Sequence, residues 1–416
     1  MSGPLDGRPD TLREFNRHKV IAALRRLDAA SRADLSRVTG LSRGTVASIV
    51  ADLQREGVLR AGGRRDVPTS GPGRPPALLA LAPPAGLAVG VDVGHSHVRV
   101  VVGDAEGAVV EERFAELSPG MAARDMLAAA ADLVEDVKTA QSLTARDVVA
   151  ATLGLPTPMD LDGQPVTPRF RGLDLAECTG LAQLATRIDV MNDADLGALG
   201  EAAFGAARDI DDFVFVKMSH GLGAGLVLGG RLYRGSDGLA GNIGHVRVRE
   251  DGNVCICGNR GCIETLVSAD SLVAALQPAH PEGDLSVADL FRLVRDGDIG
   301  TRRLVSDAGG IVGRTLGEII NVLNPSAIVV GGSLSALGEP LLQGIQAAVS
   351  RYSQPAASAR LRVVRAQCGE RAEVLGALAV ALGLVDAALP RRGIVAGRGN
   401  VAGRGNVVDE VAEPSA

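Results

Sequence analysis

The 416-residue chain has few cysteines and no tryptophan, and it lacks any long uninterrupted run of apolar residues. Five cysteines are too few for the disulfide scaffold of a small secreted protein. No stretch reaches the ~18 consecutive apolar residues that a transmembrane helix needs. The polar segment 1–10 also lacks the apolar core of a signal peptide. These absences together predict a cytoplasmic protein.

The chain also has no large excess of either charge. Its net charge is −6, and apolar residues make up 46% of it. A disordered chain would combine a lower apolar content with more net charge, so global disorder is excluded. The length predicts two or three domains rather than one.

The charge is divided unevenly along the chain. Residues 1–80 contain 14 Lys or Arg and 8 Asp or Glu, whereas the other 336 residues contain 29 and 41. A basic N-terminal segment joined to an acidic body suggests a nucleic-acid-binding module attached to a part that binds another ligand.

The basic segment has the pattern of a helix-turn-helix. Ser31 and Asp34 are spaced as a capping box that begins a short helix, and Gly40 breaks that helix. Ser42 can cap the next helix, over 43–56. Four apolar residues recur at helical spacing on one face of this second helix: Val46, Ile49, Val50 and Leu53.

Two apolar segments, 58–60 and 77–81, would form the strands of a wing around a loop rich in Gly, Arg and Pro. The N-terminal end of the second helix would enter the major groove of DNA, and the Gly-Arg-Pro stretch at 71–76 would lie in a minor groove. An ordinary helical bundle with a stiff proline-rich linker is the alternative. The residues predicted to contact DNA are Arg43, Thr45, Ser48, Arg64, Arg65 and Arg74.

From residue 86 onwards, apolar strands alternate with amphipathic helices. The order strand, strand, strand, helix, strand resembles the opening of the ribonuclease-H-like fold of actin, the Hsp70 chaperones and sugar kinases. A similar order begins again near residue 213. The sequence therefore predicts an α/β body of two lobes, with a ligand cleft between them.

These patterns divide the chain into four parts. We predict a winged helix-turn-helix domain at 1–68, a wing and linker segment at 69–85, the two-lobed domain at 86–390 and a tail at 391–416. The tail repeats the hexamer Val-Ala-Gly-Arg-Gly-Asn, which cannot bury a core, so we expect it to be disordered. An Arg-Gly contact with nucleic acid is the alternative role for this repeat.

Three of the five cysteines lie close together after a histidine, in the spacing His-x9-Cys-x-Cys-x4-Cys. Zinc prefers four such ligands in a tetrahedron, and a closed Cys3His set leaves no position for a reactive water. Three buried free cysteines beside an unrelated histidine are the alternative. The spacing predicts one structural Zn2+ per chain, bound by His245, Cys255, Cys257 and Cys262.

The segment from Gly241 to His245, followed by Cys255 to Glu264, resembles the signature of the ROK family of repressors and sugar kinases. The resemblance covers about 85–390, and the N-terminal winged helix resembles the repressor branch. In the family, a sugar is held by an Asn-Asp pair, by the Glu and His of a Gly-Glu-x-Gly-His motif, and by a Glu after the last cysteine. The resemblance implies a sugar or sugar derivative bound by Asn192, Asp193, Asn242, His245 and Glu264.

Two of these positions leave alternatives open. Asn242 stands where the family usually has Glu, so a neutral amide replaces a charged acceptor and a glucose-like ligand is not assured. Without the resemblance, Asn192 and Asp193 would be interpreted as a turn or a helix cap.

The resemblance to kinases fails at the first phosphate loop. Kinases of the family read Asp-x-Gly-Gly-Thr-Lys, whereas this chain reads Asp-Val-Gly-His-Ser-His from Asp92 to His97. Bulky side chains replace the glycine that lets backbone approach a phosphate. We therefore predict no enzyme activity, but a dimeric or tetrameric regulator that binds operator DNA, most simply as a repressor. A ROK sugar kinase is the alternative. A nicotinamide dehydrogenase is excluded because neither this loop nor the second glycine-rich run, from His220 to Gly225, opens a helix.

Overall fold

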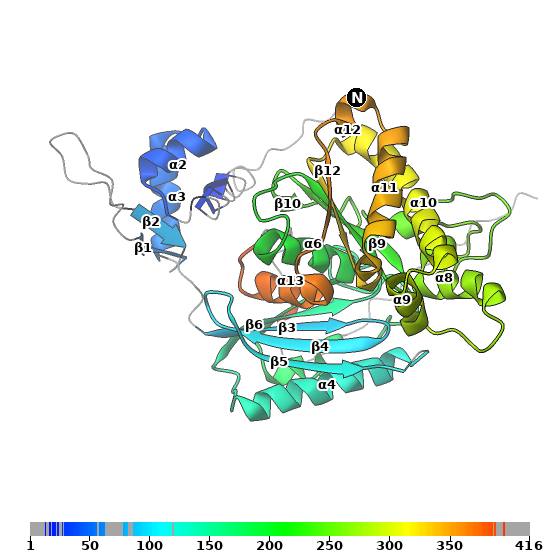
Figure 1. Ribbon diagram of the computed structural model, residues 1–416. Coiled ribbons are helices and arrows are strands. Elements are labelled where there is room, and N and C mark those ends of the chain that lie inside the picture. Colours follow the sequence, from blue (N-terminus) through cyan, green and yellow to red (C-terminus); the bar gives the residue numbers. More distant parts are fainter. Residues whose placement is uncertain are drawn as a thin grey trace, which may run out of the picture.

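The computed structural model describes residues 29–55, 58–62, 78–81, 86–118, 120–385, 387 and 394–395, with single positions between 13 and 27. Figure 1 shows a small N-terminal unit and a larger α/β body. Among the residues described, no helix is long and apolar enough to cross a membrane.

The N-terminal unit has the elements expected of a winged helix-turn-helix: α2 (Arg32–Thr39), α3 (Arg43–Arg55), and an antiparallel hairpin of β1 (Leu59–Gly62) and β2 (Leu78–Leu81). Both halves of the predicted capping box of α2 are present, and the turn after α2 has the left-handed backbone of a helix C-cap. The predicted apolar face of α3 is buried, and it packs with Leu35 and Leu59 into a small core.

The first lobe contains a six-stranded sheet in the order β13-β7-β6-β3-β4-β5. Strands β3, β4 and β5 are antiparallel to one another, whereas β6 and β7 run parallel to β3. Two residues of the predicted tail join this sheet, because Ile394 pairs with Ile188. The strands are β3 (Leu87–Val93), β4 (His97–Gly103), β5 (Val109–Glu116), β6 (Val148–Leu155), β7 (Arg187–Asn192) and β13 (Ile394–Val395).

The second lobe repeats this topology in a five-stranded sheet of order β10-β9-β8-β11-β12. Again the first three strands are antiparallel, and the next two are parallel to the first of them. The repeat confirms the predicted two-lobed ribonuclease-H-like fold. The strands are β8 (Phe213–Met218), β9 (Leu222–Leu228), β10 (Arg231–Leu232), β11 (Ala327–Gly331) and β12 (Arg362–Arg365).

Helices cover both faces of each sheet (Figure 1). α4 (Ala123–Ala140) packs on the outer face of the first sheet, and α10 (Ile299–Leu323) with α11 (Glu339–Tyr352) covers the outer face of the second. α6 (Asp193–Phe204) and α13 (Ala372–Ala381) lie between the two sheets and bury residues against both. Any side chain at the start of α6 is therefore held between the lobes.

The two central helices touch backbone to backbone. A Cβ atom on Gly376 would lie 1.8 Å from the Leu196 carbonyl oxygen, and one on Gly200 would lie 2.0 Å from that of Ala372. Only glycine permits so close a crossing.

The shorter helices are α5 (Leu175–Cys178), α7 (Glu264–Val267), α8 (Ala269–Leu276), α9 (Val287–Arg295) and α12 (Pro355–Ser358), with 3-10 turns η1 (Leu181–Gln183), η2 (Ile243–His245), η3 (Gln277–Ala279), η4 (Ser333–Leu337) and η5 (Gly369–Arg371).

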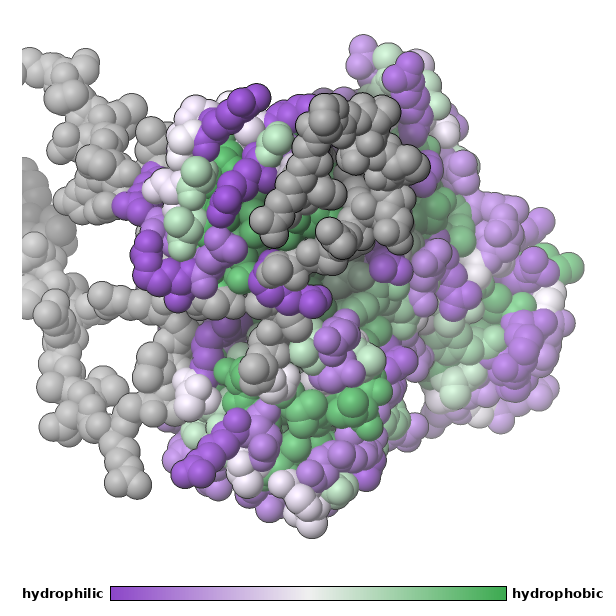
Figure 2. All heavy atoms as spheres, turned by 90° about the vertical axis from the view of Figure 1, so that its left-hand side faces the viewer, coloured by the Kyte–Doolittle hydropathy of each residue, from purple (hydrophilic) through white to green (hydrophobic). Residues whose placement is uncertain are grey.

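Most large apolar side chains of the described residues are buried in the cores of these layers. On the side of the molecule drawn in Figure 2, hydrophilic side chains are spread over the face, and hydrophobic ones gather in smaller areas between them.

Candidate functional site

The predicted DNA-contacting residues of α3 lie on the face opposite its buried stripe. Arg43 and Ser48 are exposed, whereas Thr45 is half-buried. The Ser42 hydroxyl accepts a hydrogen bond from the Thr45 amide at 3.1 Å and lies 2.8 Å from the Thr45 hydroxyl. Ser42 thus caps α3, as the sequence predicts, and the Thr45 side chain is engaged in the cap. Arg43 begins the helix and has no ion pair with any described residue.

The other three predicted contacts, Arg64, Arg65 and Arg74, lie outside the described residues. The strands on either side of them are described, and Leu59 pairs with Leu81 and Gly62 with Leu78. This hairpin confirms the wing. The contacts of its loop stay a prediction.

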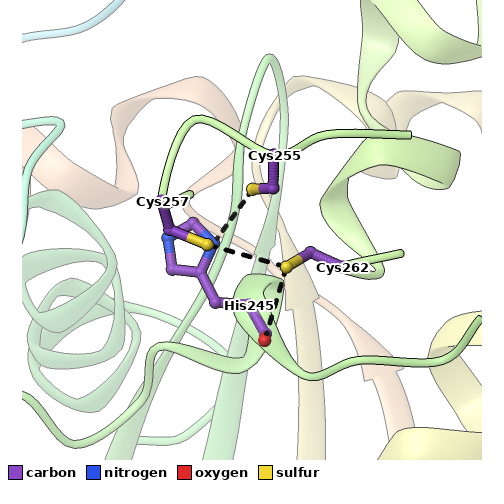
Figure 3. A group of neighbouring side chains, drawn as sticks. All are labelled: His245, Cys255, Cys257 and Cys262. Carbon is purple, nitrogen blue, oxygen red and sulfur yellow. Dashed lines mark hydrogen bonds between the residues drawn. The ribbon is translucent and has the colours of Figure 1, made fainter. Parts of the chain in front are cut away.

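The cysteine-rich loop brings its four predicted ligands together. One ligand atom each from His245, Cys255, Cys257 and Cys262 lies within 4.8 Å of the others. Figure 3 shows the three sulfur atoms turned toward the histidine. The Cys255 Sγ lies 3.5 Å from the His245 Nδ1, and the Cys257 Sγ lies 3.7 Å from the Cys262 Sγ.

The backbone of the loop explains how three cysteines so close in sequence can converge. The Cys255 amide donates to the Asn259 carbonyl at 2.7 Å, and the Gly258 amide donates back to the Cys255 carbonyl at 2.9 Å. Gly261 has a φ of +68°, and a Cβ there would lie 1.8 Å from the Arg249 carbonyl oxygen. The turn therefore requires glycine at 261.

The donor set fits a metal ion. Cys255 and Cys262 are buried, His245 is half-buried and Cys257 is exposed, so the cluster lies at the edge of the domain. Three sulfurs and one imidazole nitrogen at these separations could surround a single ion. Because His245 offers its Nδ1 to the sulfurs, its other ring nitrogen is left for a different partner.

Asn192 and Asp193 lie where β7 becomes α6. The Asn192 Oδ1 accepts from the amides of Ala194 at 2.9 Å and Asp195 at 3.3 Å, so this side chain is the N-cap of the helix. Its amide group donates to the Thr157 carbonyl at 3.1 Å. The helix-cap interpretation is thus confirmed. It is compatible with a ligand role, since Asn192 is only half-buried.

The Asp193 carboxylate forms a buried ion pair that the sequence analysis missed. The Lys217 Nζ donates to the Asp193 Oδ2 at 2.7 Å and lies 3.2 Å from the Glu373 Oε1. Burial alone would lower the pKa of Lys217, but the charges of Asp193, Glu373 and Asp92 outweigh it and raise that pKa. The sequence does contain a sign of this ion pair, because a lysine stands inside the apolar strand Phe-Val-Phe-Val-Lys-Met, where a buried charge needs a partner.

Glu264 and Asn242 belong to the segments on either side of the cysteine-rich loop. The Glu264 carboxylate accepts from the Leu222 amide at 3.0 Å, and a Cβ on Gly244 would lie 3.2 Å from it. Asn242 is exposed and donates from its side-chain amide to the Leu239 carbonyl at 3.0 Å. Folding of the loop therefore places Glu264 beside the turn that carries His245.

Strand β9 links these residues to the start of α6. Leu222 at one end of β9 holds Glu264, and a Cβ on the next residue, Gly223, would lie 3.2 Å from the Ala194 Cβ. The predicted ligand residues thus gather around this end of β9, between the lobes.

Comparison with known proteins agrees with both parts of the structure. The profile of the ROK family matches residues 88–383, and that of the winged helix-turn-helix DNA-binding domain matches residues 16–60. The chain belongs to the ROK family.

Its similarity to ROK proteins extends beyond the ROK domain. The xylose repressor of Bacillus subtilis (strain 168) is 31% identical over 373 residues, which cover 88% of this chain and 94% of that protein. The crystal structure of a ROK family transcriptional regulator, described as a homolog of the E. coli MLC protein, superposes with a TM-score of 0.70. It covers 90% of this chain and 96% of that one at 24% identity, and so shows the shared fold.

A ROK enzyme has a similar fold over a shorter range. The ROK family glucokinase from Streptomyces griseus, solved with glucose and AMPPNP, superposes with a TM-score of 0.61 at 29% identity. It covers 72% of this chain and 99% of its own. The N-terminal unit is therefore the main addition of this ROK protein relative to that enzyme.

The first loop of this ROK domain is filled by its own side chains. The Asp92 Oδ2 lies 2.8 Å from the His97 Nε2, and a Cβ on Gly94 would lie 2.4 Å from the His97 ring. Burial lowers the pKa of His97, but the hydrogen bond and charge of Asp92 outweigh it, so that pKa is raised. The imidazole of His97 thus packs over the glycine of the loop and pairs with its aspartate.

Proposed function

We propose that this ROK protein is a DNA-binding transcriptional regulator of genes for sugar metabolism. The observation that carries the proposal is a winged helix-turn-helix followed by a ROK domain in one chain, an order that spans nearly all of the xylose repressor it resembles. Such a regulator acts on chromosomal DNA, and we therefore place it in the cytoplasm.

The N-terminal unit supplies the DNA contacts in this proposal. Exposed Arg43 and Ser48, with Thr45 beside them, present the start of α3 to the major groove, and the wing arginines Arg64, Arg65 and Arg74 reach the backbone or minor groove. One winged helix reads one half-site, so two chains are needed for a palindromic operator. We propose a homodimer or a dimer of dimers.

The proposal is tested by measuring two activities of the full chain: its binding to operator DNA and its hydrolysis of ATP. Fragments upstream of the chain's own gene and of neighbouring sugar genes are titrated in a gel-shift assay, while ATP hydrolysis is followed with a panel of sugars. The full chain should shift a specific fragment and leave ATP intact. Deletion of 1–84 should abolish the shift, and binding that survives this deletion would contradict the assignment.

Phosphoryl transfer is the alternative that the shared glucokinase fold raises, and two contacts argue against it. The His97 side chain covers the loop that would cradle phosphate, and it binds Asp92. Asp193, at the position of the kinase base, is already engaged in an ion pair with Lys217. Sugar-dependent ATP turnover would establish the alternative.

For the cysteine-rich cluster we propose one structural Zn2+ per chain. The three sulfurs and one nitrogen match the ligand set that zinc prefers, and with four protein ligands no position remains for a reactive water. Bound zinc would hold His245 and Glu264 in place through the loop that joins them.

We further propose that the space between the lobes binds a neutral sugar or sugar derivative as effector. Sugar hydroxyls both donate and accept, which suits the amides of Asn192 and Asn242, the carboxylates of Asp193 and Glu264, and the free ring nitrogen of His245. The glucokinase of the same fold was solved with glucose, which supports a sugar as the ligand class.

A further inference from the structure

A lysine with an unusual environment lies beside the two helices between the sheets. Lys217 lies on the fully buried strand β8, and its side chain is only 11% exposed. The side chains of its two ion-pair partners, Asp193 and Glu373, are 12% and 4% exposed. A lysine is rarely buried unless its charge is paired, so the surroundings of this one need an explanation.

Two carboxylates contact this ammonium group, and a third lies close enough for its charge to act on it. Asp193 begins α6, Glu373 lies in the first turn of α13, and Asp92 lies on β3 of the other lobe. The charge of Asp92 is among the causes that raise the pKa of Lys217. Lys217 is thus the shared ion-pair partner of α6 and α13, and it also lies within range of the charge of Asp92 in the other lobe.

The acidic groups are not fully satisfied even with the lysine in place. The Asp92 Oδ1 and the Glu373 Oε1 are buried and accept no hydrogen bond, although the Glu373 Oε1 lies 3.2 Å from the Lys217 Nζ. Burial raises the pKa of Glu373, and Lys217 opposes that rise. Asp193 and Glu373 therefore depend on Lys217 for a compensating charge, whereas Asp92 pairs with His97.

We propose that Lys217 is a resident cation that takes the place of a divalent cation from solution between Asp193 and Glu373. Its compact ammonium group, with three donors, occupies the point where carboxylate oxygens meet. Hard ions such as Mg2+ seek the same oxygen ligands and often bind through only one or two carboxylates and water. The lysine thereby fixes the Asp193 carboxylate without any metal and leaves this group of carboxylates insensitive to magnesium.

The proposal predicts that removing the lysine creates a magnesium site. Thermal unfolding of the purified full-length protein and of Lys217→Ala is measured with MgCl2 from zero to millimolar concentration. Mg2+ does not compete for the thiolates of the cysteine cluster, because it prefers oxygen ligands. The wild-type melting temperature should not change. Lys217→Ala should melt lower, and saturating Mg2+ should raise its melting temperature by at least about 2 °C.

Two further variants separate this response from general loosening. Met218→Ala truncates the next side chain of β8, which is also buried, and it should lose stability without gaining any response to Mg2+. Lys217→Ala combined with Asp193→Asn removes a carboxylate ligand and should lose the magnesium response of the single variant. If Lys217→Ala is insoluble, its soluble yield after refolding with and without Mg2+ is compared instead.

Three outcomes would overturn the proposal. The first is a Lys217→Ala protein, or refolding yield, that does not respond to Mg2+. The second is a response of equal size in Met218→Ala, and the third is a magnesium-dependent rise in the wild type. None of these measurements depends on the operator or the effector, so the proposal can fail while the proposed function stands.

Discussion

At the residue scale, single side chains in this protein serve the fold and the site together. The side-chain oxygen of Asn192, Oδ1, caps α6, while the side-chain amide of the same residue donates to the Thr157 carbonyl. These two bonds tie the start of the helix to the first lobe. The Ser42 hydroxyl likewise caps α3, because it accepts a hydrogen bond from the Thr45 amide. In both places a cap fixes the first turn of a helix, and that turn carries the residue proposed to contact a ligand or DNA.

Arg43→Ala tests the DNA contact at this scale. Because the guanidinium lies free at the start of α3, its loss should weaken binding to the specific operator by ~1–3 kcal/mol and change binding to random DNA little. Arg55→Ala is the matched control, since Arg55 lies at the other end of α3 and pairs with Asp52 at 3.1 Å. Equal losses on operator and random DNA would show that Arg43 contacts only phosphate.

Asp195 gives a prediction about pH. Its carboxylate is buried, and the Nε of Arg234 lies 3.7 Å from it, too far for a good hydrogen bond. Burial raises the pKa of Asp195 to about 7, an effect that Asp193 adds to and Arg234 opposes. The folded protein then keeps a proton up to about pH 7 that the unfolded chain releases near its ordinary pKa of 3.8.

The sign of the effect follows from this difference. Between these two pKa values the folded state binds more protons than the unfolded state, so Asp195 makes stability fall as pH rises, by up to ~1.4 kcal/mol per pH unit. Asp195→Asn cannot ionise. The free energy of unfolding of Asp195→Asn minus that of the wild type should therefore increase from about pH 4 to pH 7. Above pH 7 this difference should stay constant. Denaturant unfolding of both proteins across this range measures the difference, and a constant difference would refute the prediction.

At the element scale, local patterns predicted much of the structure. The capping box at Ser31, the turn at Gly40, the buried face of α3 and the two wing strands all lie within short stretches of sequence. The alternation of apolar strands with helices from residue 86 was also predicted, because buried strands such as β3, β6 and β8 read as continuous apolar runs.

What was missed depends on distant parts of the chain. β12 has an Arg at each end and little buried surface, so only its pairing with β11 defines it. β7 contains a buried Asp189, which interrupts the apolar run. The ion pair of Lys217 with Glu373 joins residues of β8 and α13, and no local pattern links them. The cluster of His245 with Cys255, Cys257 and Cys262 was predictable because these residues lie close together in the sequence.

Cys257→Ser tests that loop. It replaces one of the four proposed zinc ligands with a weaker one, and the turns from Asn253 to Glu264 depend on the ligands being held together. Zinc content should fall well below one per chain, the melting temperature should drop, and operator binding should weaken. Cys178→Ser, a half-buried cysteine outside the cluster, should change none of these. Elemental analysis of the wild type showing far less than one zinc per chain would contradict the proposal.

At the scale of the whole molecule, the position of α6 and α13 couples the cleft to the rest of the fold. Both helices pack against both sheets, and their crossing at Gly200 and Gly376 leaves no room for either to slide. A ligand held by the first turn of α6 would therefore act on both lobes at once. In a dimer, a change in the angle between lobes would alter the spacing of the two DNA-binding units.

The last prediction follows from this coupling. A neutral sugar should bind at micromolar to millimolar affinity, roughly −8 to −4 kcal/mol, because Asn242 offers a neutral amide where a carboxylate would bind more strongly. Calorimetry against hexoses, pentoses and amino sugars measures the binding, and Asp193→Ala should abolish the heat.

By linkage, a sugar that weakens operator binding must itself bind less tightly to the operator complex, by the same factor. Equal sugar affinity with and without operator DNA would mean that the sugar does not control DNA binding. If no sugar binds at millimolar concentration, the cleft of this regulator has no sugar effector.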